Sequence, residues 1–349
     1  MTDALSHYAE LDDIPSGVRR WEGTADEPFL LRLEPDCDAL RTDLTAAAQW
    51  IATHKDVLDD LLLRYGGIRF RGFPIADSRA FSTFLSAYPD FGTGYSGGTS
   101  PRSVIVGRVM EATAAPSDRV VPIHQEMAYS STFPARLAFY CEVAPQGGGE
   151  TPACDMRKLT KIMPRPLHDK VHAKGLRYYR LFRSPDYVTG VPELDIVHRT
   201  WHDTFNTQDP AEAERQVRVL GSDFEWLDSG LLVSNPSRGF VDHPIGGDEV
   251  WFNSIGGYGF SRALLGERLG ALYEEHYFST GRLLPYWTTY GDGEPLDLAD
   301  IAPLYDATEE ATVSIPWQHG EVMLLDNIYA GHGRTTFEGD RKVRVILLD

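Results

Sequence analysis

Two side chains able to bind a metal stand two residues apart in the segment VPIHQEMAYS (121–130), where Gln125 separates His124 from Glu126. In an extended backbone alternate residues share one face, so this imidazole and this carboxylate can point to the same place. A third ligand from elsewhere would complete a divalent metal site, and two histidines with one carboxylate leave positions open for ligands, as in non-haem Fe(II) oxygenases. Taken alone, the pair is better explained as a surface histidine beside a solvated glutamate.

A second group of chemically capable residues lies near the end of the chain, in LLDNIYAGHGRTTFEGDRKVRVIL (324–347). His332 stands between two glycines directly after an apolar strand, where a ligand can approach the backbone closely. Arg341 and Arg344 follow on the predicted last strand, three residues apart, so only one of them can point inward. An inward arginine is explained either by bidentate binding of a ligand carboxylate or by pairing with an internal acid. Both explanations stay open at this point.

Composition limits what kind of protein can carry these groups. The chain has 349 residues, 42% of them hydrophobic, which is enough apolar surface for a real core. Its formal net charge of −18 repels nucleic acid and anionic membranes, so we expect neither as a partner. Three cysteines do not make a disulfide framework and indicate reduced thiols. We find no signal-peptide pattern and no apolar run long enough for a membrane span, and we expect a soluble cytoplasmic protein with a small-molecule partner.

Short strands dominate the predicted elements. Apolar spacing predicts helices within 38–64, 77–88, 210–219 and 259–276, and the first forty residues are expected to form an irregular arm. Branched and aromatic runs predict strands at 66–74, 103–110, 136–144, 175–183, 230–236 and 249–255, with three more in the C-terminal segment. The pattern favours a mainly β fold with flanking helices and a double-stranded β-helix (jelly-roll) core. We expect one domain over 1–349, with a long insert at roughly 156–310 between core strands.

Four motifs in this order resemble one family: IHQEMAYS, FYCEVAPQGGGETPACDMR, EVWFN and LLDNIYAGHGRTTFEGDRKVRV. They are similar to the Fe(II)/2-oxoglutarate-dependent dioxygenases of the taurine dioxygenase and clavaminate synthase type, closest to the biosynthetic branch that modifies amino acids. The resemblance runs from about Gly66 to the last residue. It implies a jelly roll, O₂ and 2-oxoglutarate as co-substrates, and Fe(II) held by His124, Glu126 and His332. Thr151 matches the family's hydroxyl residue that contacts 2-oxoglutarate.

The distal carboxylate of 2-oxoglutarate has two candidate partners. The HGR-x-x-F-x-G-x-R pattern points to Arg341, which we prefer, while the broader family spacing would accept Arg344. Several residues on or next to the predicted site strands are candidates for substrate binding, although Trp251 is more simply explained as a core aromatic: Arg108, Gln125, Tyr129, Ser130, Trp251 and Asn253.

The resemblance implies hydroxylation, desaturation or cyclisation at an unactivated C–H bond of an amino acid or an amino-acid-derived intermediate, free or carrier-bound, with release of succinate and CO₂. An alternative is a cupin-like jelly-roll enzyme that uses the same ligands for isomerisation or hydrolysis. A third is a binding protein with a degenerate site, which the presence of all three ligands disfavours. A non-oxidative enzyme needs no clamp for a dicarboxylic co-substrate, so the Arg341 and Thr151 pair separates the alternatives.

Overall fold

A large sheet forms one wall of the core in the computed structural model, which describes residues 14–20, 29–92, 102–195, 198–255 and 262–349. Its strand order is β1-β2-β3-β17-β7-β20-β5-β4. All of its ladders are antiparallel except the β2–β3 pair. In sheet order the strands are Val18–Arg20, Leu31–Pro35, Gly67–Phe70, Val322–Asp326, Arg136–Val143, Lys342–Leu348, Val109–Glu111 and Val104–Val106.

A smaller sheet of order β16-β9-β18-β6 forms the opposite wall. Side chains of both sheets meet in one buried cluster, in which Ala153 and Ala330 of the smaller sheet join Phe139, Leu325 and Val345 of the larger one. Two sheets packed through alternating inward residues are the jelly-roll arrangement, so the predicted fold class is confirmed. The smaller sheet comprises Thr312–Val313, Ala153–Asp155, Ala330–Arg334 and Val121–His124, and β8 (Gly147–Gly148) pairs with β19 (Phe337–Glu338) beside it.

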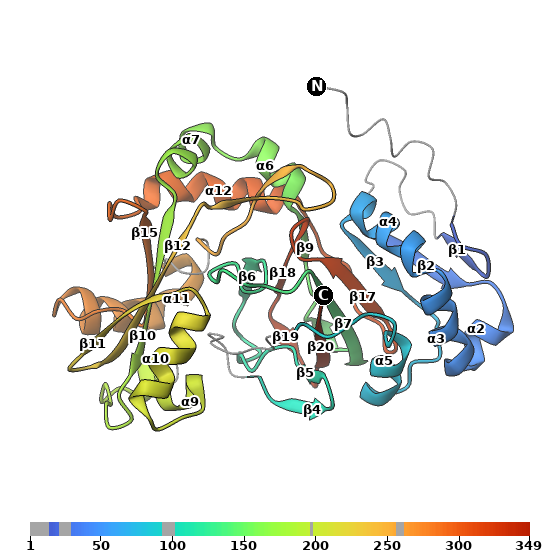
Figure 1. Ribbon diagram of the computed structural model, residues 1–349, viewed down its shortest axis with the longest axis horizontal. Helices are drawn as coiled ribbons and strands as arrows, with labels where there is room; N and C mark the ends of the chain where they lie inside the picture. Colours follow the sequence, from blue (N-terminus) through green and yellow to red (C-terminus); the bar gives the residue numbers. More distant parts are fainter. Residues whose placement is uncertain (1–13, 21–28, 93–101, 196–197, 256–261) are drawn as a thin grey trace.

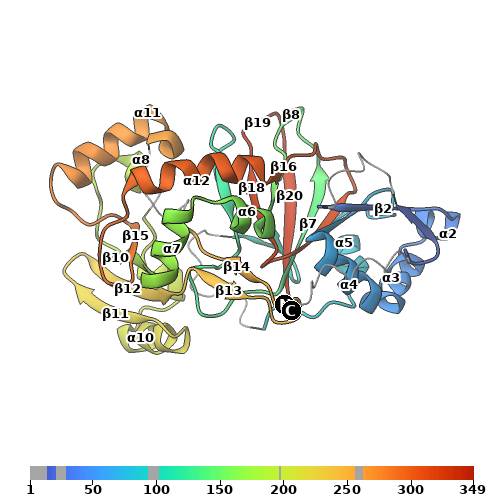
Figure 2. The ribbon, with the colours of Figure 1, turned by 90° about the horizontal axis from the view of Figure 1, so that it is seen from above.

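Helices cover the outer faces of both sheets (Figures 1 and 2). The large sheet packs its outer apolar side chains against α2 to α5, and the smaller sheet packs against α6 and α12. Asp43 and Asp77 accept backbone hydrogen bonds at the starts of α3 and α5, which fixes where these helices begin. These helices are Asp38–Thr42 (α2), Leu44–Thr53 (α3), Lys55–Tyr65 (α4), Ser78–Phe84 (α5), Met156–Ile162 (α6) and Leu298–Glu310 (α12).

Residues between the two halves of the jelly roll build a four-stranded sheet of order β11-β12-β10-β15, at the left of Figure 1. Its strands pair with one another, as do β13 and β14. The division into one domain with a long insert stays a prediction. The elements are Leu176–Arg183 (β10), Asp223–Leu227 (β11), Gly230–Ser237 (β12), Phe240–Asp242 (β13), Glu249–Trp251 (β14), Tyr286–Tyr290 (β15), Arg165–Lys174 (α7), Pro192–Asp195 (α8), Trp201–Phe205 (α9), Pro210–Val219 (α10), Arg262–Tyr273 (α11) and a π-helix at Glu274–Phe278.

The expected irregular arm is wrong for the residues that the structure describes before position 40. β1 and β2 extend the large sheet, because Leu31 and Leu33 alternate with exposed or half-buried residues and pack under the helices. The strand predicted at 103–110 is a hairpin, since Gly107 turns the chain at φ +54° between β4 and β5. The predicted helix at 259–276 starts partly outside the described residues. Across the described ranges, no helix has the length and apolar character needed to cross a membrane.

Candidate metal centre

The pairing of β6 with β18 brings two distant histidines together. These strands run antiparallel with His332 opposite His124, and the two imidazole centroids lie 4.4 Å apart. Glu126 lies two residues beyond the end of β6, and its Oε2 is 3.8 Å from Nε2 of His332. One ligand atom from each of the three residues lies within 4.8 Å of the others. The structure therefore gathers the three residues that the sequence nominated, although the histidines are 208 positions apart (332 − 124).

Hydrogen bonding and burial prepare both imidazoles to bind a metal. Nδ1 of His124 lies 2.8 Å from the carbonyl oxygen of Pro122, so it carries the proton and leaves Nε2 as a ligand. Burial, together with nearby His124 and Arg102, lowers the pKa of His332 well below its ordinary value. A neutral histidine is the form that a metal requires. Two neutral imidazoles and one carboxylate are a donor set that fits Fe(II).

A second polar pair lies where the residue before β20 of the large sheet meets the segment before β9 of the smaller sheet. Arg341, immediately before β20, donates from Nη2 to Oγ1 of Thr151 at 3.2 Å and from Nε to the carbonyl of Gly149 at 2.7 Å. Trp317 donates to the same Thr151 hydroxyl at 3.0 Å. Burial, reinforced by Arg334, lowers the pKa of Arg341 to about 10, which leaves the guanidinium charged at neutral pH. This pair offers a buried cation and a hydroxyl to an anionic group.

The second arginine candidate lies elsewhere. Arg344 lies within β20, and its Nε donates to Oε2 of Glu142 at 2.5 Å. This is the internal-acid alternative that the sequence left open for an inward arginine. The structure thus brings Arg341, and not Arg344, into contact with Thr151.

Three of the candidate substrate residues reach a cavity of about 540 Å³ that His124 also lines. They are Gln125, Trp251 and Asn253. The Gln125 amide donates to the carbonyls of Trp251 and Ile328, and the Asn253 amide bridges Gly239 and Ile255, so both help to hold the cavity wall. Trp251 packs edge-on against Phe240, consistent with a core aromatic.

The structure does not bring the other three candidates to this cavity. Arg108 donates to Asp90 and to the backbone carbonyls of Ser82, Leu85 and Tyr88, so its guanidinium secures a loop beside the large sheet. Tyr129 is buried with Arg180 over its ring at 5.0 Å. The Ser130 hydroxyl accepts a hydrogen bond from the backbone of Thr132.

Sequence reasoning missed two residues that contact Glu126. Arg102 donates from Nη2 to Oε2 of Glu126 at 2.6 Å, and Asn327 bonds both backbone groups of Glu126. Arg102 follows a Gly- and Ser-rich stretch that shows no strand or helix pattern, so the sequence gives no sign that it lies near the metal ligands. Asn327 lies inside a quoted motif, and a polar residue directly after an apolar strand is the signal that would have found it.

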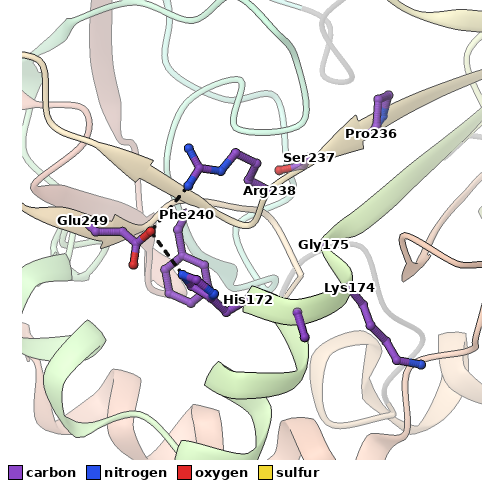
Figure 3. A pocket seen from close by; sticks show the side chains of 9 residues that line it. His172, Lys174, Gly175, Pro236, Ser237, Arg238, Phe240 and Glu249 are labelled. Carbon is purple, nitrogen blue, oxygen red and sulfur yellow. Dashed lines mark ion pairs between the residues drawn. The ribbon is translucent and has the colours of Figure 1, made fainter.

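A second cavity, of about 470 Å³, lies between α7 and the β12–β13 connection (Figure 3). His172 and Arg238 both approach Glu249, at 3.4 Å and 3.6 Å. Lys174 pairs instead with Asp292 and Glu294. No residue of the His124, Glu126 and His332 cluster lines this cavity, and its charged groups are neutralised by neighbours.

A jelly roll with two histidines on its smaller sheet and a carboxylate beside them carries the donor set typical of non-haem iron oxygenases. The family model for taurine catabolism dioxygenase TauD, TfdA family, matches residues 31–347. The chain belongs to this family and is a non-haem iron dioxygenase that depends on 2-oxoglutarate. The resemblance drawn from the four motifs is thereby confirmed.

Two curated relatives extend over most of the chain. A clavaminate synthase-like protein from Arabidopsis thaliana is 30% identical over 347 residues, covering 96% of this chain and 98% of the relative. The dapdiamide synthesis protein DdaC from Enterobacter agglomerans is 30% identical over 294 residues, covering 84% of each chain. Among solved structures, PvcB from Pseudomonas aeruginosa superposes with a TM-score of 0.53 at 14% identity, covering 97% of this chain and 94% of PvcB. That last similarity concerns the fold alone.

Proposed function

We propose that the protein oxidises an unactivated C–H bond of an amino acid or an amino-acid-derived intermediate, with His124, Glu126 and His332 as the ligands of Fe(II). The observation that carries this proposal is the convergence of these three side chains within 4.8 Å on the inner side of a jelly roll. With iron and 2-oxoglutarate bound, O₂ supplies the oxidant for C–H cleavage, and co-substrate carbon leaves as succinate and CO₂. The protein itself supplies orientation and exclusion of water.

We assign the far carboxylate of 2-oxoglutarate to Arg341 and Thr151. The guanidinium and the hydroxyl are 3.2 Å apart, and both are held by further hydrogen bonds. A planar guanidinium binds a carboxylate through two parallel hydrogen bonds, which would also fix the direction of the co-substrate. The same pair argues against the cupin-like isomerase or hydrolase, because such an enzyme has no dicarboxylic co-substrate to hold.

An amino acid or its derivative is supported as substrate by two features. The relative DdaC is named for dapdiamide synthesis, and the other curated relative for its likeness to clavaminate synthase. The cavity that His124 lines has the size of small-molecule sites and a mostly apolar wall, where Ile123 is joined by Met156 of α6 and Leu304 of α12, whereas Glu126 and His332 do not line it. A substrate with an apolar body, either free or tethered to a carrier, fits that wall.

A cytoplasmic location is supported by the cysteines. Cys37, Cys141 and Cys154 are all free thiols. Burial raises the pKa of Cys141 and of Cys154 to about 12, so these two thiols stay protonated and unreactive. Such a set suits a reducing compartment.

A turnover assay tests the proposal. The apoprotein is loaded with Fe(II) and 2-oxoglutarate, and a panel of amino acids and carrier-bound aminoacyl groups is screened in air. The readouts are substrate-dependent succinate release and a product mass increased by one oxygen or decreased by two hydrogens. We expect at least one amino acid or derivative to give equal amounts of succinate and product. Succinate formation that no amino acid or carrier-bound aminoacyl group stimulates would overturn the substrate assignment, and absence of any 2-oxoglutarate turnover would overturn the residue roles.

A further inference from the structure

The carboxylate of Glu126 is shared between the metal cluster and a cation. Its Oε2 accepts a hydrogen bond from Nη2 of Arg102 at 2.6 Å, and the same oxygen faces Nε2 of His332 at 3.8 Å. The Arg102 side chain is 6% exposed and that of Glu126 is 3% exposed, so the pair is buried. The oxygen that faces His332 is therefore the oxygen that Arg102 already holds.

Metal binding would change the balance of charge between Arg102 and Glu126. Without metal, the Arg102 cation and the Glu126 anion compensate each other. A divalent metal adds two positive charges beside a buried guanidinium, and metal-bound imidazoles are neutral, so nothing in the cluster offsets them. The near carboxylate of 2-oxoglutarate returns one negative charge, since its far carboxylate belongs to Arg341 under the proposed function. Among the charged groups of the described residues named here, one positive charge is then in excess, and a ligand carboxylate would balance it.

We propose that Arg102 recognises a ligand carboxylate at the iron site: metal binding draws Glu126 away from the guanidinium, which then binds the carboxylate of the incoming substrate. This inference rests on the proposed function and deepens it, because it names the carboxylate as the group of the amino acid substrate that the protein recognises. Guanidinium geometry suits a carboxylate, which it binds through two parallel hydrogen bonds. The remaining source of the same chemistry is the near carboxylate of 2-oxoglutarate.

Mn(II) titration, followed through the electron paramagnetic resonance signal of the free ion, tests the first half of the proposal without turnover. Arg102→Gln removes the competing cation, and we expect it to bind Mn(II) about tenfold more tightly than wild type in the absence of carboxylates. Arg102→Lys keeps the charge and should stay within threefold of wild type. Arg136→Gln is the matched control, because it removes a half-buried arginine of β7 that pairs with Asp59 of α4. Thermal unfolding checks that each variant is folded.

The second half is tested on the Mn(II)-loaded proteins. Affinities are measured for 2-oxoglutarate and, with 2-oxoglutarate present, for each free amino acid beside its carboxamide. We expect Arg102→Gln to lose at least tenfold in affinity for the amino acid that wild type binds, and to bind the carboxamide as wild type does. A loss confined to 2-oxoglutarate, including the case in which wild type binds no amino acid of the panel, assigns the recognised carboxylate to the co-substrate.

Three results would overturn the proposal. The first is Arg102→Gln with Mn(II) and carboxylate affinities all within twofold of wild type. The second is a variant that gains Mn(II) affinity while both kinds of carboxylate bind unchanged. The third is a loss of Mn(II) affinity without carboxylates, which would make Arg102 a support for Glu126. Failure of wild type to bind Mn(II) or 2-oxoglutarate would instead contradict the proposed function, so the two failures are distinguishable.

Discussion

The side-chain amide of Asn327 holds the backbone of Glu126 from both sides. Oδ1 of Asn327 accepts from the Glu126 amide at 2.8 Å, and Nδ2 donates to the Glu126 carbonyl at 3.0 Å and to the Pro134 carbonyl at 2.8 Å. Asn327 follows β17 and is fully buried, while Glu126 lies just beyond the end of β6. A proposed metal ligand on a segment without strand pairing thus gains a fixed position from the opposite sheet.

We expect Asn327→Asp to weaken metal binding. A carboxylate at this position cannot donate to the two carbonyls, and each buried group left unsatisfied costs roughly 1–3 kcal/mol. Loss of an outer-shell support typically lowers metal affinity by about 10–100-fold. Mn(II) titration and urea unfolding measure the two effects.

Asn235→Ala is the control for that variant, because Asn235 is another buried amide but bonds to Arg180 and Ser222. It should reduce the free energy of unfolding and leave Mn(II) affinity near wild type. Equal Mn(II) affinities for Asn327→Asp and Asn235→Ala would show that the amide clamp does not position Glu126.

The two C-terminal arginines should separate in their effects on 2-oxoglutarate. We expect Arg341→Ala to raise the 2-oxoglutarate concentration needed for half-saturation by at least about tenfold, because the proposed partner of the far carboxylate is lost. Arg344→Ala should change it far less, because Arg344 is paired with Glu142. The 2-oxoglutarate concentration at half-saturation, measured for both iron-loaded variants, distinguishes the two assignments. The reverse ranking would exchange the two assignments.

Packing of the smaller sheet predicts a cost for any side chain at Gly333. A Cβ atom there would lie 2.6 Å from the carbonyl oxygen of Val121 on the neighbouring strand β6, so β6 and β18 would have to separate. We expect Gly333→Ala to reduce the free energy of unfolding by about 1–3 kcal/mol and to weaken Mn(II) binding, because His332 is adjacent. Gly147→Ala, where a Cβ meets nothing within 4 Å, should change unfolding by less than about 0.5 kcal/mol. Unfolding free energies that match between the two variants would refute this packing argument.

A half-buried histidine outside the metal cluster, His198, makes stability depend on pH. Burial, with a further contribution from Arg183, lowers the pKa of His198 to about 3 from the unfolded value of 6.5. Below pH 6.5 His198 binds a proton in the unfolded chain, whereas in the native protein it stays neutral until the pH approaches 3. His198 therefore makes the free energy of unfolding fall as the pH falls toward 3.

His198→Gln should remove up to about 1.4 kcal/mol per pH unit of that slope. Urea unfolding of wild type and variant between pH 6.5 and pH 4 measures the difference, and the contributions of other groups cancel in the comparison. Parallel stability curves would mean that His198 is protonated in the native state.

Local patterns predicted much of this fold because their signals are local. The branched runs of β7 and β10 and the capped helix α5 are identified by residues within the element itself. β2 was missed because its pairing with β3 arises only in the assembled sheet, and residues 29–35 carry no turn signals of a hairpin.

The site divides in the same way. His124, Glu126 and His332 lie in motifs that a sequence can display, and so does the Thr151 and Arg341 pair. Arg102 and Asn327 lie 24 and 201 positions from Glu126 in the sequence, so their contacts with Glu126 form only in the folded chain. The glycines around His332 were expected to admit a ligand, whereas Ile123, Met156 and the backbone of Val121 pack against them. These contacts depend on tertiary packing, which local sequence patterns do not display.

The charge-transfer absorption that develops when 2-oxoglutarate chelates ferrous iron tests the central claim most directly. Wild type, mixed with Fe(II) and 2-oxoglutarate without oxygen, should develop this band, and His124→Ala, shown to be folded by circular dichroism, should not. A His124→Ala protein whose band matches wild type in position and intensity would contradict the assignment of His124, Glu126 and His332 as the iron ligands.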